Sequence, residues 1–278
     1  MEILILGLGL IGGSMAKALK YYTNHTVFGY DPDINAVRKA LLVGACDNAE
    51  NEIPPLDRFD VIIMASYPRA GIGFIKEYAH KIRPNAYVFD LGGVKRDVCA
   101  TGFEAAEKFG FTFIGGHPMA GTQFSGFTAS RENLYKGATM ILVPPHGVDV
   151  EKLDFGVRFF KSVGFEAVSV TTAEKHDEII AYTSQLAHVL SNAYVKSPTA
   201  PRHKGYSAGS FRDLTRVAHL NAHMWTQLFT DNRDKLVPEI EGLAAKLLEY
   251  ADALRSGDEA KLEELLAEGS RINDEIKS

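Results

Sequence analysis

The segment EILILGLGLIGGS, residues 2–14, sets the architecture expected for this chain. Its first half is an apolar run of strand length, and a helical pattern follows directly. Gly7, Gly9 and Gly12 lie at the junction in the spacing Gly-x-Gly-x-x-Gly. In a strand–turn–helix unit, the first glycine permits a tight turn, the second admits a pyrophosphate to the backbone, and the third allows close packing of helix and strand. The segment therefore predicts a dinucleotide site, the alternative being a purely structural turn.

The rest of the first half alternates apolar runs with helical stretches. Strands are expected over residues 2–8, 26–31, 59–66, 86–93, 111–118, 138–145 and 165–171, and helices over 12–22, 34–44, 71–82 and 150–164. This alternation implies parallel βαβ units, and strands that are apolar throughout imply a sheet covered on both faces. Residues 1–172 are thus predicted to form an α/β dinucleotide-binding domain of the Rossmann type, with a doubly wound, mostly parallel sheet.

The residues after Thr172 show helical periodicity instead, without a run typical of a strand. Helices are expected over 173–196, at several places within 211–256, and over 258–276, with an irregular loop over 197–210. Residues 173–278 are therefore predicted to form a second, all-α domain.

Composition limits the classes of partner. The chain has 278 residues, a net charge of −5 and no basic block, so nucleic acid, which needs clustered Lys and Arg, is not an expected partner. The longest apolar runs are too short for a bilayer, so no membrane association is expected. Cys46 and Cys99 lie outside any C-x-x-C or zinc-type spacing and are interpreted as ordinary thiols in a reducing cytoplasm.

Asp31 indicates which dinucleotide is bound. It ends the second predicted strand, roughly 20 residues beyond the glycine motif, where an acid accepts hydrogen bonds from the adenosine ribose and repels a 2′-phosphate. NAD is therefore expected rather than NADP, with a plain turn residue as the alternative for Asp31. The residues expected to bind the cofactor are Gly7, Gly9, Leu10, Ile11, Gly12, Asp31 and Ser66.

The glycine-rich segment GGHPMAGTQFSG, residues 115–126, contains a candidate catalytic residue. His117 is expected just past the end of a strand, and ligands of an open α/β sheet lie beyond the carboxyl ends of its strands. A neutral imidazole there would accept a proton from a hydroxyl group as hydride leaves the same carbon, since an unperturbed histidine has a pKa of about 6.5. A histidine that only satisfies loop backbone groups is the equal alternative.

The helical half carries polar residues on otherwise apolar helices. Ser184 and His188 are four residues apart and share one helical face. Arg212 and Arg216 are spaced in the same way, and an arginine near a cleft binds a carboxylate through its planar fork. A surface ion pair between Asp213 and one of these arginines is the alternative.

His219 and His223 also have the four-residue spacing of a metal-binding pair. No nearby Cys or further His–carboxylate set completes such a site in the sequence. A metal is therefore not expected.

Six segments together resemble the prephenate/arogenate dehydrogenases of tyrosine biosynthesis. They are GLGLIGGS (7–14), DLGGVK (90–95), GGHPMAGT (115–122), YTSQLAHVL (182–190), GSFRDLTRVA (209–218) and MW (224–225), and the resemblance extends over nearly the whole chain. The histidine loop followed by the distant Asp-x-Thr-Arg motif is the specific part of this resemblance. The dinucleotide motif alone would not support it.

The resemblance implies an activity and roles for particular residues. Hydride leaves C4 of prephenate for the nicotinamide, the C4 hydroxyl loses its proton, and CO2 departs as the ring becomes aromatic, which gives 4-hydroxyphenylpyruvate. His117 would accept the hydroxyl proton, and Arg216 would bind a substrate carboxylate. The all-α domain would form an intertwined homodimer. The other residues implied at the substrate are Gly93, Thr122, Gln123, Ser184 and His188.

Two positions depart from the pattern of the family. Gly93 stands where many members have a serine whose hydroxyl helps to hold the histidine and the substrate, and Gln123 stands where many prephenate-using members have glutamate. Arogenate carries an added positive charge, and replacing a nearby anion with a neutral amide weakens any preference for that cation. Prephenate is therefore the expected substrate.

Three alternatives stay open. The first is an arogenate dehydrogenase that gives tyrosine directly. The second is a different reductase of the same two-part plan, which would need a catalytic lysine such as Lys196 or Lys204 and would leave His117 unused. The third, from another class, is a non-catalytic NAD-binding regulator, which would leave both His117 and Arg216 without a task.

Overall fold

The computed structural model describes residues 1–277, and the chain falls into two compact units, Met1–Asn232 and Arg233–Ser278. The first unit holds an eight-stranded sheet with its covering helices, and the second holds two long helices. The domain boundary near Thr172 stays a prediction.

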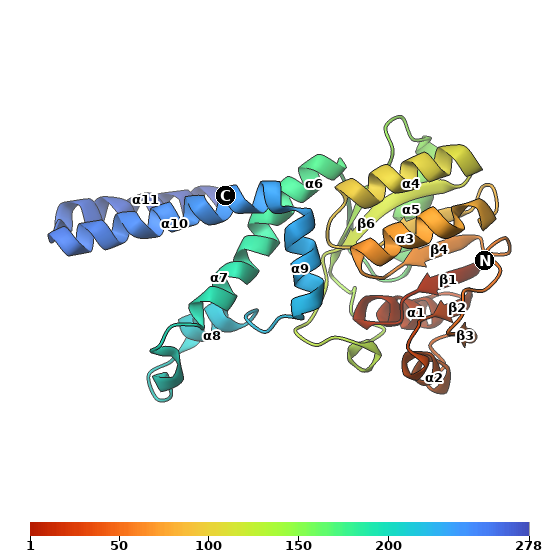
Figure 1. Ribbon diagram of the computed structural model, residues 1–278, viewed down its shortest axis with the longest axis horizontal. Coiled ribbons are helices and arrows are strands. Elements are labelled where there is room, and N and C mark those ends of the chain that lie inside the picture. Colours follow the sequence, from red (N-terminus) through yellow and green to blue (C-terminus); the bar gives the residue numbers. More distant parts are fainter. Residues whose placement is uncertain (278) are drawn as a thin grey trace. The chain divides into compact units, whose positions relative to one another are not determined.

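The sheet has the strand order β3-β2-β1-β4-β5-β6-β7-β8. Figure 1 shows the part from β3 through β2 and β1 to β4. Its strands are β1 (Glu2–Leu6), β2 (Thr26–Tyr30), β3 (Asn48–Glu50), β4 (Val61–Met64), β5 (Tyr87–Asp90), β6 (Thr112–Pro118), β7 (Thr139–Val143) and β8 (Ala167–Val170). Every neighbouring pair is parallel except β6 and β7. The first six strands follow the order typical of dinucleotide-binding sheets, so the predicted doubly wound, mostly parallel sheet is confirmed.

Successive strand residues point to opposite faces of the sheet, and each face has its own core. In β1, Ile3 and Ile5 belong to one buried cluster, and the alternate residues Leu4 and Leu6 belong to the other. Each fully buried side chain of this size contributes about 1.5–3 kcal/mol, which holds helices on both faces. Helices α1 (Leu10–Tyr22), α2 (Ile34–Leu42) and α5 (Val150–Ser162) cover the first face, and α3 (Pro68–Tyr78) and α4 (Arg96–Phe109) cover the second (Figure 1).

Two elements of the sheet layer were not predicted. Strand β3 is short and polar, with Ala49 as its single buried residue, so it lacks an apolar pattern. Helix α4 contains Gly102, a residue type that weakens a helical prediction. A Cβ at Gly102 would lie 2.5 Å from Cε1 of Phe113, so α4 needs this glycine in order to pack against β6.

The prediction that His117 lies just past a strand is wrong. His117 is the penultimate residue of β6 and is paired with Ile141 of β7. Residues 112–114 of β6 pair with β5 in parallel, whereas residues 115–118 pair with β7 in the antiparallel direction. The antiparallel pairing with β7 therefore extends β6 through His117. The irregular part of the glycine-rich segment begins after Pro118.

Beyond the sheet the chain is helical, as predicted, and residues 173–277 contain no strand. The predicted helix over 173–196 consists of α6 (Ala173–Ile180), a π-helical segment η3 (Ala181–Leu186) and α7 (Ala187–Tyr194). Helices α8 (Gly209–Thr215) and α9 (Ala222–Asp231) complete the first unit. Short 3-10 turns occur at η1 (Ala79–Lys81), η2 (Phe127–Ala129) and η4 (Ala200–Arg202).

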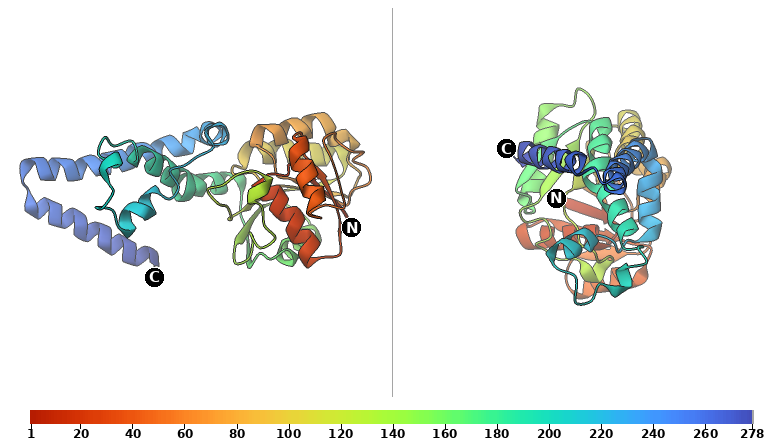
Figure 2. Two further views of the ribbon diagram at one scale, coloured as in Figure 1. Left: turned by 90° about the horizontal axis from the view of Figure 1, so that it is seen from below. Right: turned by 90° about the vertical axis from the view of Figure 1, so that its left-hand side faces the viewer.

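The second unit is a helical hairpin of α10 (Arg233–Ser256) and α11 (Glu259–Lys277) (Figure 2). Its turn contains Gly257 with a φ of 70°, and the Tyr250 hydroxyl donates to the Leu265 carbonyl oxygen at 3.2 Å. Within residues 1–277, no helix combines the length and apolar character needed to cross a membrane.

Cys46 and Cys99 are buried free thiols, in line with their interpretation as ordinary cysteines. Burial raises the pKa of Cys46 to about 12, and the nearby Asp47 carboxylate adds to the effect. Burial also raises the pKa of Cys99. Both side chains therefore stay protonated at neutral pH and behave as small apolar groups.

Candidate active site

The turn between β1 and α1 needs two of its glycines for steric reasons. Gly7 has a φ of 95°, and a Cβ there would lie 2.7 Å from the Ala65 carbonyl oxygen. A Cβ at Gly12 would lie only 1.8 Å from the Gly7 carbonyl oxygen, so a larger residue would push the helix off the strand. Gly9 differs, because nothing lies within 4 Å of its Cβ position. That open space is where the glycine motif places a pyrophosphate.

Helix α1 begins directly beyond this open space. Its N-cap residue is Gly9, and within residues 1–277 no side chain caps the helix, so the N–H groups at its start, including those of Leu10 and Ile11, have no capping acceptor. A helix N-terminus carries a partial positive charge and binds anions. Ser66 lies at the same place, since its backbone nitrogen is 3.4 Å from the Cβ position of Gly7.

The Asp31 carboxylate is fixed beside the glycine turn. Its Oδ2 accepts the Leu8 N–H at 2.7 Å, and its Oδ1 accepts the Asp33 N–H at 2.9 Å. An ionised carboxylate offers about four acceptor positions, so lone pairs remain for ribose hydroxyls. The residues predicted to bind the cofactor thus gather at one edge of the sheet, and their contact with a dinucleotide stays a prediction.

His117 is hydrogen-bonded to a pair of residues that sequence reasoning missed. Its Nδ1 lies 2.8 Å from Nε2 of His176, and Nδ1 of His176 lies 2.7 Å from Oδ1 of Asp177. His176 and Asp177 lie in α6 and are buried, whereas His117 is half-buried. Polar residues near the start of a helix are ordinary in a sequence, so only the docking of α6 beside β6 reveals this pair.

The surroundings of His117 keep its ring neutral at pH 7. Burial lowers the pKa of His117 well below its usual value, and His176 and Lys95 add to the effect. Burial also lowers the pKa of His176, although its hydrogen bond with Asp177 opposes the shift. Burial by itself would raise the pKa of Asp177, but hydrogen bonds with His176, Arg96 and Lys95 bring that pKa below its usual value. Asp177 is therefore ionised beside two neutral histidines.

A buried ion pair fixes the backbone next to His117. Lys95 is fully buried, and its Nζ lies 2.5 Å from Oδ2 of Asp90, the last residue of β5. Asp90 also accepts the N–H groups of Gly92 at 2.9 Å and Gly116 at 3.1 Å. Removing one member of a buried pair typically costs about 3–5 kcal/mol. The pair therefore links the end of β5, the start of α4 and the residue that precedes His117.

A second group of polar residues lies on the helices after the sheet. Nδ1 of His188 donates to the Ser184 carbonyl oxygen at 2.8 Å, because a carbonyl can only accept. The His188 ring lies over Trp225 with 4.0 Å between the ring centroids. Burial lowers the pKa of His188; the Ser184 bond opposes this shift, whereas the nearby charge of Arg216 adds to it. Arg216 is exposed and, within residues 1–277, makes no ion pair with Asp213.

The remaining predicted substrate residues lie outside both groups. Thr122 and Gln123 are exposed after β6, and the Thr122 hydroxyl bonds locally with the backbone of Phe124 at 3.2 Å. Within residues 1–277, no hydrogen bond joins either residue to His117. Gly93 packs against α9, since a Cβ there would lie 3.1 Å from Cδ2 of Leu228.

His223, one of the two histidines considered for a metal, makes other contacts. Nε2 of His223 lies 3.0 Å from Nε2 of Gln227, and the His223 ring lies 5.7 Å from the Tyr67 ring between centroids. The described residues 1–277 contain no group of three or more His, Cys, Asp or Glu side chains arranged to hold a metal ion.

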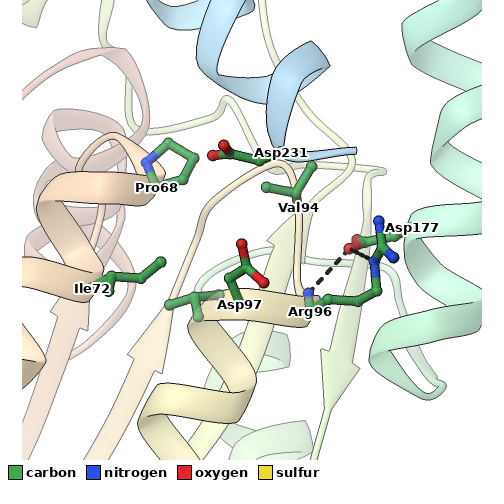
Figure 3. Close-up of a pocket in the computed structure, with 8 residues that line it drawn as sticks. Pro68, Ile72, Val94, Arg96, Asp97, Asp177 and Asp231 are labelled. Carbon is green, nitrogen blue, oxygen red and sulfur yellow. Dashed lines mark hydrogen bonds and ion pairs between the residues drawn. The ribbon is translucent and has the colours of Figure 1, made fainter. Parts of the chain in front are cut away.

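Asp177 also lines a small cavity (Figure 3). Arg96 lines the same cavity and donates two hydrogen bonds to Oδ2 of Asp177, one from the backbone N at 3.0 Å and one from Nε at 3.2 Å. The cavity volume of about 10 Å³ is on the scale of one water molecule, so it cannot hold a substrate. It is lined by Pro68, Ile72, Val94, Arg96, Asp97, Val98, Asp177 and Asp231.

Comparison with known proteins identifies two matching domain families. Residues 15–169 match the nucleotide-binding domain of prephenate dehydrogenase, and residues 172–268 match its dimerization domain. The chain is 30% identical to the prephenate dehydrogenase of Bacillus subtilis over 86% of this chain and 66% of the relative. It is 28% identical to the cyclohexadienyl dehydrogenase of Zymomonas mobilis, over 100% of this chain and 96% of the relative.

Solved structures agree with these matches. Prephenate dehydrogenase of Aquifex aeolicus, in complex with hydroxyphenyl propionate and NAD+, superposes with a TM-score of 0.86 at 30% identity and covers 99% of this chain and 98% of that one. Arogenate dehydrogenase of Synechocystis shares the fold, with a TM-score of 0.80 at 24% identity over 99% of this chain and 100% of that one.

The glycine turn after β1 and the neutral His117 near the end of β6 lie at the same edge of the sheet. With the matching nucleotide-binding domain, they indicate a dinucleotide-dependent oxidoreductase. The chain belongs to the prephenate dehydrogenase family.

The steric difference between two glycines of the turn gives a test of this site. Gly12→Ala is expected to lower the melting temperature by roughly 5 °C, because overpacking costs about 1–3 kcal/mol. Gly9→Ala is the matched control: its new Cβ meets no atom, so its melting temperature should stay close to that of the wild type, while dinucleotide binding weakens. Thermal unfolding of both variants measures the difference, and equal melting temperatures would contradict the steric account.

Proposed function

We propose that the chain catalyses the NAD-dependent oxidative decarboxylation of prephenate to 4-hydroxyphenylpyruvate, a step of tyrosine biosynthesis. The observation that carries the proposal is the neutral, half-buried ring of His117 near the carboxyl end of β6, at the edge of the sheet where the glycine turn after β1 also lies. Membership of the prephenate dehydrogenase family supports it.

NAD is the cofactor, and the residues present fit it. The open space beside Gly9 and the uncapped start of α1 suit a pyrophosphate, and the fixed Asp31 carboxylate suits ribose hydroxyls. The nucleotide-binding domain of the family and the NAD+ bound by the A. aeolicus relative agree with this fit. When bound, NAD supplies the acceptor for hydride.

The reaction requires a proton acceptor at the substrate hydroxyl. The C4–H bond of prephenate breaks with loss of hydride, and the proton of the C4 hydroxyl moves to His117. The bond between C1 and its carboxylate then breaks, CO2 leaves, and the released electron pair completes the aromatic ring. The oxygen on C4 finally regains a proton and becomes the phenol. A ring of His117 that is already neutral at pH 7 accepts the first proton without prior deprotonation.

Arg216 supplies the carboxylate-binding group of the proposal. Its guanidinium is exposed, carries no ion pair with Asp213, and lies close enough to His188 to lower the pKa of that ring. Prephenate bears two carboxylates, and a guanidinium binds a carboxylate with two parallel hydrogen bonds. Ser184 and His188 would line the pocket beside it, with Thr122, Gln123 and Gly93 contributed by the sheet side.

Substrate choice within the family rests on charge. Relatives carry the names prephenate, cyclohexadienyl and arogenate dehydrogenase, so the family alone leaves the choice open. Gln123 is a neutral amide and offers no anion to the ammonium group of arogenate. This favours prephenate, with arogenate dehydrogenase as the alternative.

We further propose that the enzyme is a cytoplasmic homodimer. The matching dimerization domain covers residues 172–268, and the helical hairpin exposes large apolar side chains that a second copy would cover. These side chains include Val237, Leu247, Leu248, Leu254, Leu266 and Ile276.

An NADH-appearance assay tests the proposed activity directly. Purified protein is mixed with prephenate or arogenate and with NAD or NADP, and turnover should be fastest with prephenate and NAD. Binding of NAD without turnover in any combination would favour the non-catalytic regulator and exclude the proposed reaction.

His117→Asn is expected to lower kcat by roughly 10²–10⁴-fold with little change in KM, because proton removal matters only in the transition state. Steady-state kinetics with prephenate and NAD measure both constants. A wild-type kcat in a folded variant would remove His117 from the mechanism.

The lowered pKa of His117 predicts a shifted pH profile. The proton acceptor must be unprotonated, so activity falls as the pH drops through the pKa of His117 in the free enzyme. Burial holds that pKa well below the usual 6.5, and the acid limb of kcat/KM should therefore have its midpoint below pH 6.5. A midpoint at or above pH 6.5 would mean that the ring is not desolvated in solution.

Arg216→Ala is expected to raise KM for prephenate by about tenfold or more, since the guanidinium binds the carboxylate in the ground state as well. Arg212→Ala is the matched control, because Arg212 is an exposed arginine one helical turn earlier and should leave KM unchanged. If both variants gave the wild-type KM, Arg216 would have no part in substrate binding.

A further inference from the structure

The three side chains His117, His176 and Asp177 form a hydrogen-bonded chain whose direction can be deduced. Asp177 is ionised, and its two oxygens also accept the backbone N–H groups of Lys95 at 2.8 Å and Arg96 at 3.0 Å. An ionised carboxylate only accepts hydrogen bonds. The Nδ1 of His176, at 2.7 Å from Asp177, must therefore carry a proton.

The next link follows from the neutral state of His176. Burial lowers the pKa of His176, so a single proton stays on the ring at neutral pH, and the Nδ1 position takes it. Nε2 of His176 then carries a lone pair and no proton, so it can only accept a hydrogen bond. Since His117 Nδ1 lies 2.8 Å from that lone pair, His117 must donate from Nδ1.

The last link fixes the free nitrogen of His117. A neutral imidazole with its proton on Nδ1 has an unprotonated Nε2. Nε2 of His117 is thus the basic nitrogen. This assignment follows from hydrogen bonds within the protein alone and involves no group of the substrate.

The pair in α6 is buried and is held by groups from α4 and from the residue after α9. His176 and Asp177 are 2% and 1% exposed. From α4, Arg96 adds a side-chain bond from Nε to Asp177 at 3.2 Å. From the residue after α9, the Asn232 side-chain amide donates to the Asp177 carbonyl oxygen at 2.8 Å. The charged groups around the two rings are Lys95, Asp90, Asp177 and Arg96.

Within residues 1–277, the segment after the neighbouring strand β5 offers His117 no side chain that gives the same support. Gly93 has no side chain there, and the apolar Leu228 fills the adjoining space at 3.1 Å from the Cβ position of Gly93. Among the described residues 1–277, His176 is thus the side chain that hydrogen-bonds to His117.

We propose that His176 and Asp177 are positioning residues that hold His117 in the Nδ1–H tautomer, so that Nε2 of His117 is the atom that accepts the substrate proton. The inference rests on the proposed function, because the proton acceptor is defined by that reaction. It deepens that function by naming the accepting atom and two residues that act through His117.

The tautomer can be measured without turnover. Protein labelled with ¹⁵N-histidine is studied by NMR at neutral pH, with His117→Asn used to assign the His117 ring. Nδ1 of His117 should carry the proton and Nε2 should be unprotonated. A ring protonated on Nε2, or one that exchanges between both tautomers, would overturn the proposal even if the enzyme turns over prephenate.

Two substitutions at His176 test the same point through kinetics. His176→Gln keeps an amide oxygen near the position of Nε2 that can accept from His117, whereas His176→Leu fills the buried site without an acceptor. We expect kcat to fall about tenfold or more in His176→Leu with KM little changed, and to stay within about threefold of the wild type in His176→Gln. Melting temperature and NAD affinity confirm that each variant is folded.

The outcomes separate this proposal from the proposed function. A folded His176→Leu variant with the wild-type kcat would overturn the positioning role, and so would an equal loss in a folded His176→Gln variant. If His176→Leu fails to fold, the tautomer in the wild-type protein decides the question. A wild-type enzyme without turnover refutes the proposed function, yet the measured tautomer still supports or refutes the chain of hydrogen bonds.

Discussion

The arrangement of the site depends on one buried carboxylate, that of Asp177. It accepts the N–H groups of Lys95 and Arg96 where α4 begins, and thereby caps that helix from a distant part of the chain. A helix N-terminus stabilises a negative charge, whereas the same carboxylate buried without donors would cost about 3–5 kcal/mol. Helix α6 is therefore held where it can satisfy Asp177, and this docking brings His176 to the histidine of β6.

Burial explains how neutral histidines persist in a cluster of ionised groups. Lys95 and Arg96 contribute two positive charges, and Asp90 and Asp177 contribute two negative ones, so the formal charges of the four side chains cancel. Burial is the largest cause of the lowered pKa of each imidazole and favours its uncharged form, and Lys95 adds to this effect. Burial therefore keeps the His117 ring neutral, and its hydrogen bond with His176 determines which of its nitrogens carries the proton.

The sequence predicted features whose physical causes are local. The spacing of Gly7 and Gly12 indicated a strand, a turn and a helix, because the steric demand acts within a few residues. His117 was identified as a candidate, but its place within β6 depends on pairing with β7, which no local pattern reports. His176 and Asp177 resemble any polar residues early in a helix, and only docking against α4 buries them.

The π-helical segment η3 determines which changes in length the chain between Asp177 and His188 can accept. A helix turns by about 100° per residue, and a π-helical segment accommodates one residue more than an α-helical path between the same ends. Shortening residues 181–186 by one would therefore restore an α-helical path between the same ends and keep His188 on Trp225, with Asp177 in place. During divergence this stretch should therefore accept the loss of one residue, whereas the loss of two would turn His188 and all of α7 away from Trp225.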